Sequence, residues 1–288
     1  MAALNKQTVT VMMTCFNRMK YTVPCVKALA EGNPDISFHF IITDDNSTDG
    51  TREALERLPY SITLLTGNGQ LFWNGGMEKA LDHALTQAVQ TDYYLLVNDD
   101  VVFFEGAIEA LIKRQRNAPK ASGTKRTGES AVIAGSTSDT EGRTSYGGVK
   151  LLSKHFARFG LVEPSEEYKE CDTFNGNCVL LPREVFFRAG NVDGSYRHSM
   201  SDYDYGMKLR KLGFLIYNSA EHVGCCNDND VAGSWRDCTL KRRERLQKKE
   251  SPKGLPRKDW YHFIRKNYGF FPALYHSITP YIRILLGR

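Results

Sequence analysis

The sequence has little of what marks secreted or membrane-spanning proteins. Its 288 residues include only seven cysteines, an odd number, and their spacing gives neither a CxxC pair nor a zinc-binding pattern. The first twenty residues lack the charged start and apolar run of a secretory signal. No apolar run approaches the length of about 18 residues that suggests a transmembrane helix. We therefore expect reduced thiols and a soluble protein in the cytoplasm.

Extremes of composition are absent as well. Hydrophobic residues make up 41% of the chain and charged residues 25%, a balance that argues against disordered, collagen-like and coiled-coil proteins. The length allows one large domain or two small ones.

Charge is distributed unevenly along the chain. Residues 236–288 carry 14 Lys and Arg against 4 Asp and Glu, a balance of +10, whereas residues 1–235 carry 24 against 29, a balance of −5. We interpret the chain as an acidic domain, residues 1–235, followed by a basic and aromatic C-terminal extension, residues 236–288. Such an extension suits an anionic partner, either nucleic acid or a membrane surface, and the alternative is a solvated helical face.

Strand and helix patterns alternate along the first hundred residues. Apolar or β-branched runs of strand length occur at 8–16, 38–43, 61–65 and 93–97. Helical patterns lie between them. One spans 21–30, a second runs through Leu58 after an N-cap at Ser47 or Thr48, and a third spans 75–88. Further strands are predicted at 131–137, 144–148, 177–181 and 214–217, with helices opening at Pro182 and spanning 202–212. The alternation predicts a parallel sheet with right-handed crossovers.

Polar residues follow the apolar strands at the point where each strand ends. Asn17, Asp44 and Asp99 stand at three such ends. In an open parallel sheet the ligand crevice lies beyond the carboxyl ends of the strands, so these residues should converge on one site.

Two acidic pairs follow strands. Asp99 and Asp100 repel each other unless a cation neutralises them, and Mg²⁺ or Mn²⁺ bound to phosphate oxygens would do so. A solvated turn is the alternative. Asp44 and Asp45 are suited to accept hydrogen bonds from a nucleobase or a ribose, or else form an N-cap and turn.

Two further signals concern helix starts. Gly75 and Gly76 are expected to open a helix whose N-terminus suits a diphosphate, unless they form a plain turn. Asp202 and Asp204 begin the late helix, where the helix dipole alone explains a carboxylate. The functional interpretation is that one of them is a general base.

In this order the motifs resemble the family 2 glycosyltransferases with the GT-A fold. They are TxxN from Thr14, DDxSxDGT from Asp44, the GG helix, NDD, GN and a late SDxDxxxKxxxxG from Ser201. The resemblance covers roughly residues 8–222. Segments 70–80 (QLFWNGGMEKA) and 171–178 (CDTFNGNC) are similar to a bacterial branch of the family that acts in surface-polysaccharide assembly.

The resemblance implies an α/β fold of the GT-A type, a Rossmann-like, mostly parallel sheet with flanking helices, followed by a basic helical extension. It implies a metal, Mg²⁺ or Mn²⁺, on Asp100 with Asp99, and His222 as a further ligand. The family's base matches Asp202, and Asp204 is the alternative because Ser201 replaces the family's Glu before it. The remaining implied contacts are with the nucleotide (Thr14, Asn17, Arg18, Asp44, Asp45, Gly75, Gly76, Asp99) and with the sugar or acceptor (Trp73, Asn74, Asn175, Gly176, Asn177).

The activity so implied is inverting transfer of a hexosyl or deoxyhexosyl group from a nucleotide-diphosphate sugar to a glycan hydroxyl. The resemblance favours a lipid-linked acceptor in polysaccharide or lipopolysaccharide synthesis. It also favours an anionic membrane over nucleic acid as the partner of the extension, hence a peripheral location at the inner face of the membrane. The alternative is a catalytically idle sugar-nucleotide-binding or scaffolding protein on the same fold. Nucleotidyltransferases of related topology have a Gly-rich N-terminal signature, which TCFNR at residues 14–18 lacks.

Overall fold

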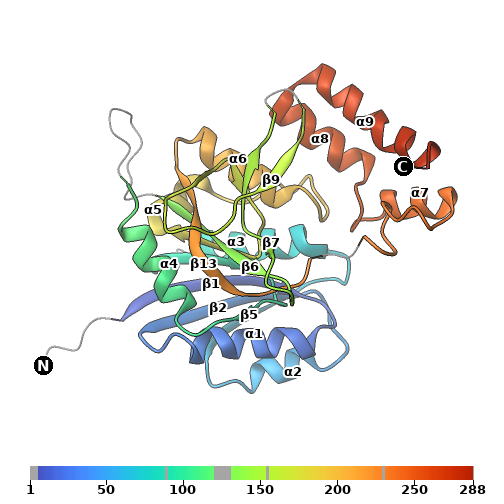
Figure 1. Ribbon diagram of the computed structural model, residues 1–288. Helices are drawn as coiled ribbons and strands as arrows, with labels where there is room; N and C mark the ends of the chain where they lie inside the picture. Colours follow the sequence, from blue (N-terminus) through green and yellow to red (C-terminus); the bar gives the residue numbers. More distant parts are fainter. Residues whose placement is uncertain (1–5, 88–89, 120–130, 154–155, 229–230, 288) are drawn as a thin grey trace, which may run out of the picture.

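The computed structural model of the protein describes residues 6–87, 90–119, 131–153, 156–228 and 231–287 (Figure 1). The first part confirms the predicted alternation of strands and helices. Its elements are β1 (Gln7–Cys15), α1 (Met19–Glu31), β2 (Ile36–Asp44), α2 (Thr51–Glu56), β3 (Ser61–Thr66), α3 (Phe72–Thr86) and β4 (Tyr93–Val97).

The later part adds short strands and helices to the same sheet. Its elements are β5 (Val102–Phe103), α4 (Ala107–Arg116), β6 (Val132–Ser138), β7 (Thr144–Tyr146), β8 (Gly148–Leu151), β9 (Phe159–Leu161), β10 (Glu170–Cys171), β11 (Thr173–Phe174), β12 (Cys178–Pro182), α5 (Arg183–Ala189), α6 (Ser201–Lys211) and β13 (Ile216–Cys225). The strand order is β10-β13-β6-β12-β4-β1-β2-β3, with β5 on β13 and β7 on β6. β11, β8 and β9 form a separate small sheet.

The main sheet is mostly parallel through its long strands. β3, β2, β1 and β4 pair in parallel, as do β6 and β13, whereas β12 lies antiparallel between β4 and β6. Side chains alternate between its two faces, and both faces are apolar because helices cover each of them. One face packs on α1 and α4 through Val11, Leu95 and Leu111, among others. The other packs on α3, α5 and α6 through Met12, Leu96 and Met77.

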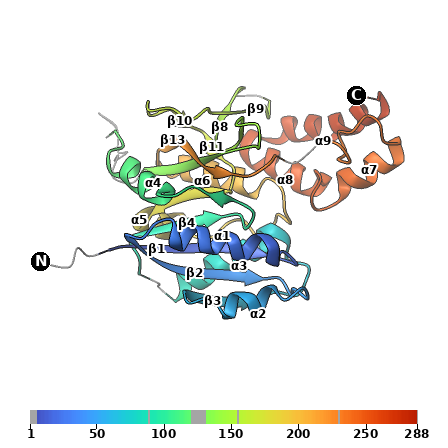
Figure 2. The same ribbon diagram turned by 60° about the horizontal axis from the view of Figure 1, so that its bottom comes forward.

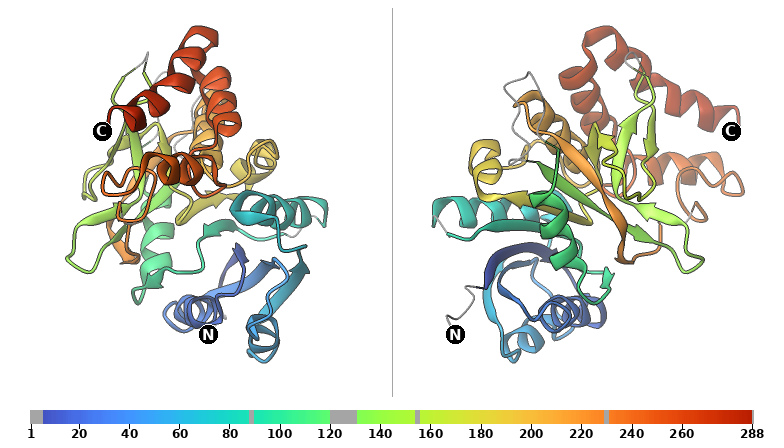
Figure 3. Two further views of the ribbon diagram at one scale, coloured as in Figure 1. Left: turned by 90° about the vertical axis from the view of Figure 1, so that its right-hand side faces the viewer. Right: turned by 60° about the vertical axis from the view of Figure 1, so that its left-hand side comes forward.

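Three helices follow β13 and correspond to the predicted basic extension. They are α7 (Arg242–Glu250), α8 (Arg257–Tyr268) and α9 (Phe270–Leu285). Figures 2 and 3 show them, in orange to red, at the opposite end of the molecule from β1–β3. A buried apolar cluster packs Trp260 and Phe263 of α8 and Ala273 of α9 against Tyr196 and against Met207 of α6. Of the helices in the described ranges, none combines the length and apolar character needed to cross a bilayer.

Candidate active site

The carboxyl ends of β1, β2 and β4 meet at one edge of the sheet, as predicted. Cys15, the last residue of β1, is in register with Asp44, the last residue of β2. Burial raises the pKa of the Cys15 thiol, and the charges of Asp44 and Asp99 add to that rise. The residues that follow these three strands therefore surround one place.

Arg18 neutralises the acidic pair that follows β4. Its Nε lies 3.0 Å from Asp99 Oδ1 and its Nη2 lies 2.7 Å from Asp100 Oδ2. Thr22, one helical turn after Arg18, donates to Asp99 Oδ2 at 2.8 Å. Burial raises the pKa of Asp99 to about 6, against the lowering effect of Arg18 and Thr22. Asp99 is thus buried and fully engaged, whereas the Asp100 side chain keeps 35% of its surface exposed.

A thiol contacts the second oxygen of Asp100. Cys226 follows β13, and its Sγ lies 3.6 Å from Asp100 Oδ1. Burial and the Asp100 charge raise the pKa of this thiol to about 12, so it is a neutral donor and not a thiolate. Asn177 donates to Cys226 Sγ at 3.5 Å, and its carbonyl accepts from the N–H of Asn98 at 3.1 Å. Asn177 is predicted to contact the sugar or acceptor. In the structure it contacts Cys226, which lies beside Asp100, and Asn98, which precedes Asp99.

His222 does not join the acidic pair in this structure. It lies within β13, and its Nε2 is 3.0 Å from Thr144 Oγ1. Within the described ranges, no group of three or more His, Cys, Asp or Glu side chains is arranged to hold a metal. β13 runs on to Cys225, several residues beyond the predicted end at 217, and this places Cys226, not His222, beside Asp100.

The loops after β1 and β2 hold each other through the residues predicted to bind the nucleotide. Asn17 has a left-handed backbone (φ 53°), and its Oδ1 accepts from the Thr48 N–H at 2.7 Å. Asp44 accepts from the Ser47 N–H at 3.1 Å. Asp45 accepts from two backbone N–H groups, of Gly69 and Leu71, each at 2.8 Å, and so fixes the segment that leads into α3.

The prediction that Gly75 and Gly76 open a helix is wrong, because α3 already begins at Phe72. The N–H of Gly75 is taken by the Leu71 carbonyl at 3.1 Å and is not free for a diphosphate. Gly76 is required for packing, since a Cβ there would lie 2.0 Å from Thr14 Oγ1. Thr14 itself donates to the Thr43 carbonyl at 3.2 Å, so these residues join α3 to the sheet.

Trp73 connects the acidic pair with the predicted base. Its indole N–H donates to Asn98 Oδ1 at 2.7 Å, directly before Asp99. On its other side the ring lies against Gly176, where a Cβ would approach the ring to 2.6 Å. The N–H of Gly176 in turn donates to Asp202 Oδ2 at 3.1 Å.

Among the residues that the structure describes, only backbone groups donate to Asp202. Its Oδ1 accepts from its neighbour Tyr203 at 2.8 Å and its Oδ2 from Gly176. Burial raises the pKa of Asp202 to about 6, and the two backbone hydrogen bonds oppose that rise. No cation is paired with this carboxylate among the ion pairs of the described residues. A carboxylate with a raised pKa and no paired cation has the properties of a general base near neutral pH.

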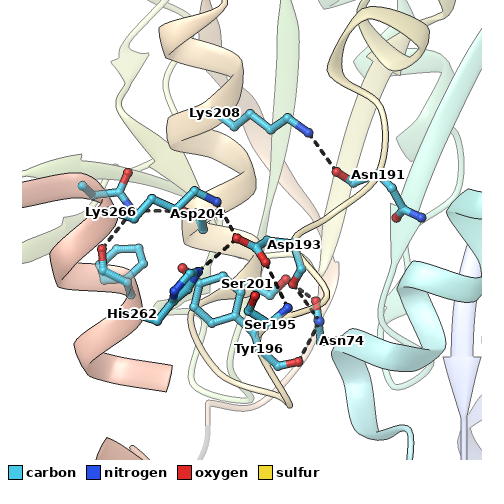
Figure 4. A network of polar contacts seen from close by, with 12 residues as sticks. Asn74, Asn191, Asp193, Ser195, Tyr196, Ser201, Asp204, Lys208, His262 and Lys266 are labelled. Carbon is cyan, nitrogen blue, oxygen red and sulfur yellow. Dashed lines mark hydrogen bonds and ion pairs between the residues drawn. The ribbon is translucent and has the colours of Figure 1, made fainter. Parts of the chain in front are cut away.

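Asp204 faces away from this place. Two residues along a helix turn the side chain by about 200°, and Asp204 points toward α8. Lys266 Nζ lies 2.6 Å from its Oδ2 (Figure 4). Asn267 Nδ2 donates to its Oδ1 at 2.9 Å. Lys266 and His262 also contact Asp193, in the loop before α6. Asp204 thus attaches α8 to α6, a structural role distinct from that of Asp202.

Asn74 was predicted to line the sugar or acceptor pocket, but the structure buries it completely. Its Nδ2 donates to the carbonyls of Asp193 and Tyr196, at 3.0 and 2.8 Å, and its Oδ1 accepts from Ser201 Oγ (Figure 4). Every polar atom of the side chain is therefore used to hold the segment that leads into α6. Asn175, by contrast, is partly exposed, and its Nδ2 approaches the Tyr203 hydroxyl at 3.5 Å.

Replacing Asn74 by Ala is expected to lower the free energy of unfolding by about 2–4 kcal/mol, because two carbonyls and a hydroxyl lose a buried partner. Chemical denaturation measures this change. Asn68→Ala is the matched control: that residue is exposed, its Oδ1 accepts only from Gln70, and its loss should cost less than about 1 kcal/mol. Equal midpoints for the two variants would contradict the assigned role.

The sequence did not single out Thr22, Cys226 and His198, whose side chains make contacts at the site. The Trp73 N–H donates to His198 Nδ1 at 3.4 Å. Burial lowers the pKa of His198 to about 4, so its ring is neutral. Thr22 carried a usable signal, since it lies four residues, about one helical turn, after Arg18, the N-cap residue of α1.

Comparison with known proteins agrees with this arrangement. Residues 10–159, slightly more than half of the chain, match the sequence model of glycosyl transferase family 2. Two curated relatives from Mycobacterium tuberculosis, strains CDC 1551 / Oshkosh and ATCC 25618 / H37Rv, are each named N-acetylglucosaminyl-diphospho-decaprenol L-rhamnosyltransferase. Each is 26% identical over 207 residues, covering 61% of this chain and 62% of the relative. The chain thus spans less than two thirds of these relatives.

Solved structures of low sequence identity share the fold. The mannosyltransferase PcManGT from Pyrobaculum calidifontis, in complex with GDP-Man and Mn²⁺, has a TM-score of 0.54 at 15% identity, over 96% of this chain and 74% of that one. TarS 1-349 from S. aureus, in complex with UDP-GlcNAc, has a TM-score of 0.56 at 14% identity, over 96% and 81%. These likenesses confirm the predicted GT-A fold.

Proposed function

The chain belongs to glycosyltransferase family 2, and we propose that it is a metal-dependent inverting glycosyltransferase that uses a nucleotide-diphosphate sugar. The observation that carries this proposal is the chain of contacts from Asp99 to Asp202. Trp73 contacts Asn98 on one side and Gly176 on the other, and Gly176 holds Asp202. One site thus joins an acidic pair suited to a metal and a diphosphate with a carboxylate suited to deprotonate an acceptor.

The acidic pair fits a divalent ion that arrives together with the diphosphate. Mg²⁺ is usually held by one or two carboxylates, with substrate phosphates and water completing its shell. Asp100 provides such a carboxylate, because its side chain is partly exposed. In the described part of the chain, no third acidic, His or Cys side chain joins Asp99 and Asp100 to complete a metal site made by the protein alone. The solved structures of PcManGT and of GalNAc-T7 are complexes with Mn²⁺. When bound, the ion would stabilise the charge that develops on the leaving diphosphate.

The chain's own residues then serve the transfer as follows. The acceptor hydroxyl gives its proton to a carboxylate oxygen of Asp202, and its oxygen forms a bond to the anomeric carbon. The bond from that carbon to the diphosphate oxygen breaks, and the nucleoside diphosphate leaves with the electron pair. Attack from the face opposite the leaving group inverts the anomeric configuration. Arg18, beside Asp99 and Asp100, adds positive charge close to the leaving group. Asn17, two residues after β1, and Asp44, the last residue of β2, would contact the nucleoside.

The relatives guide the proposed substrates. Their name describes transfer of L-rhamnose, a deoxyhexose, to a sugar on a diphospho-polyprenol. We therefore propose a deoxyhexosyl or hexosyl donor, a lipid-linked glycan acceptor and a part in cell-surface polysaccharide synthesis. The acceptor would then be met at a membrane surface, on the cytoplasmic side where nucleotide sugars are made. Residues 1–235 would form the catalytic domain and residues 236–288 its extension.

A panel of nucleotide sugars tests the proposal. We expect one donor, taken from UDP-, GDP- and dTDP-activated hexoses and deoxyhexoses including rhamnose, to raise the melting temperature in the presence of Mn²⁺ and to be slowly hydrolysed. The catalytically idle alternative predicts the thermal shift without any release of nucleoside diphosphate. No shift with any donor, in Mn²⁺ or Mg²⁺, would contradict both.

A further inference from the structure

The C-terminal helix α9 is apolar on two opposite faces. One face, which includes Ala273, Ser277 and Ile284, is buried, with Ala273 in the cluster around Trp260 and Phe263 of α8. At 100° per residue, the side chains on the other face point away from it. These are Phe271, Tyr275, Ile278, Ile282 and Leu285, which together with Phe270 and Leu274 at the edge form the exposed α9 face.

This face is unlike the outer surface of an ordinary helix. Its seven side chains are exposed by between 43% for Leu274 and 80% for Phe271, and α9 contains no Asp or Glu. The outer face of a helix in a soluble protein is normally polar, and large apolar patches mark interaction sites. Phe156, half exposed, extends the patch from the segment between β8 and β9, with its ring 6.0 Å from that of Tyr275.

The surroundings of the exposed α9 face are basic. Exposed cations on or near α7, α8 and α9 are Lys241, Arg242, Arg243, Lys253, Arg257, Lys258, Arg265 and Arg283. Two of the three acidic residues of α7, α8 and α9 are engaged: Asp259 is buried and accepts from the Arg197 N–H, and Glu250 contacts Lys249 and Tyr281. The third, Glu244, is exposed. Arg245 follows the exposed basic run at 241–243 but is itself buried, with its Nε donating to the Trp235 carbonyl.

We propose that the exposed α9 face lies in the interfacial layer of an anionic lipid bilayer, with the helix parallel to the membrane surface. Large apolar side chains on one side and Lys and Arg around them are the pattern of interfacial helices. A bilayer satisfies both parts, because its apolar interior takes the Phe, Ile and Leu side chains and its anionic headgroups take the cations. Nucleic acid would meet only the charge. The reason for this location rests on the proposed function, since a lipid-linked acceptor is presented at the membrane.

Vesicle co-sedimentation without donor or acceptor tests the proposal directly. The protein should sediment with vesicles of phosphatidylglycerol and phosphatidylcholine, and less with pure phosphatidylcholine or in high salt. The triple variant Phe271→Gln, Ile278→Gln, Ile282→Gln should bind at least tenfold more weakly. All three side chains are exposed, so the fold should survive, which a thermal melt verifies.

Two control variants separate the contributions. Leu212→Gln with Val231→Gln removes exposed apolar side chains away from α9 and should bind like the wild type. Lys241→Gln with Arg242→Gln and Arg243→Gln should weaken binding to anionic vesicles and reduce its dependence on salt. Unchanged binding by the α9 variant would overturn the proposal. So would a wild-type protein that stays in solution with anionic vesicles at low salt, including one that forms a dimer abolished by the α9 variant.

These outcomes are distinct from failure of the proposed function. Transfer to a water-soluble acceptor analogue needs no bilayer, so the α9 variant should retain it. An enzyme that transfers sugar but ignores vesicles refutes the membrane proposal alone. A protein that binds vesicles but transfers no sugar refutes the proposed function alone.

Discussion

Replacing Asp202 by Asn is expected to lower turnover by about 10²- to 10⁴-fold, with donor affinity close to that of the wild type. The amide preserves the shape of the side chain but cannot take the proton of the acceptor hydroxyl. It has one acceptor oxygen, so it keeps only one of the two hydrogen bonds from Tyr203 and Gly176, at a cost of about 1 kcal/mol in stability. Steady-state kinetics together with donor titration measures the change.

The pH dependence of kcat/KM gives a second test of Asp202 as the base. Burial raises the pKa of Asp202 from 3.8 to about 6, and only the deprotonated carboxylate accepts a proton. The value of kcat/KM should therefore be constant above about pH 7 and fall roughly tenfold per unit below pH 6. The residual rate of Asp202→Asn should lack this acidic limb. A wild-type rate that stays level down to pH 5 would contradict the assignment of Asp202 as base.

Asp204→Asn is the matched control, because it makes the same chemical change two residues away. Its carboxylate is paired with Lys266 and Asn267, so the variant should lose stability through α8 but keep turnover within a few fold per folded molecule. The opposite result, a large loss of turnover for Asp204→Asn and almost none for Asp202→Asn, would exchange the two roles.

The resemblance favours Asp202 as the base, but the sequence keeps Asp204 as an alternative because the choice depends on a distant segment. Local spacing places both carboxylates in the first turn of a helix and cannot indicate which of them faces the sheet. The answer depends on Lys266 and Asn267, about sixty residues later, which take up one carboxylate and leave the other. The strand ends were predictable, by contrast, since the position of Asp99 at the end of an apolar run follows from local pattern and parallel topology.

The start of α3 shows the same limit. The sequence favoured Gly75 and Gly76 as the first residues of the helix, yet the helix begins at Phe72, whose backbone is left-handed (φ 54°). That start is supported by Asp45, which accepts from the Leu71 N–H across 26 positions of sequence. The shift of one turn moves Asn74 from the expected pocket into the interior. Trp73 is brought between Asn98 and Gly176, a contact that no local pattern contains.

Replacing Asp100 by Ala is expected to weaken metal-dependent binding of the nucleoside diphosphate by more than tenfold. Asp100 is the member of the pair with an exposed carboxylate, whereas Asp99 is held by Thr22 and Arg18. Calorimetric titration with the nucleotide in Mn²⁺, and again in EDTA, measures the effect. In the wild type EDTA should reduce affinity by at least as much as the substitution does. Equal wild-type affinity in Mn²⁺ and EDTA would show that no metal is needed.

Glu105→Ala is the control for charge, since Glu105 is an exposed acidic residue five positions later and should leave nucleotide affinity unchanged.

The position of Arg18 leads to a further prediction, which concerns the affinity for the metal ion itself. Because its guanidinium already neutralises Asp99 and Asp100, a divalent ion alone gains little by binding there. The diphosphate brings additional negative charge that both cations can share. Mn²⁺ titrated without nucleotide should therefore bind at least tenfold more weakly than in its presence, and equal affinity in the two titrations would mean that Arg18 does not compete for the acidic pair.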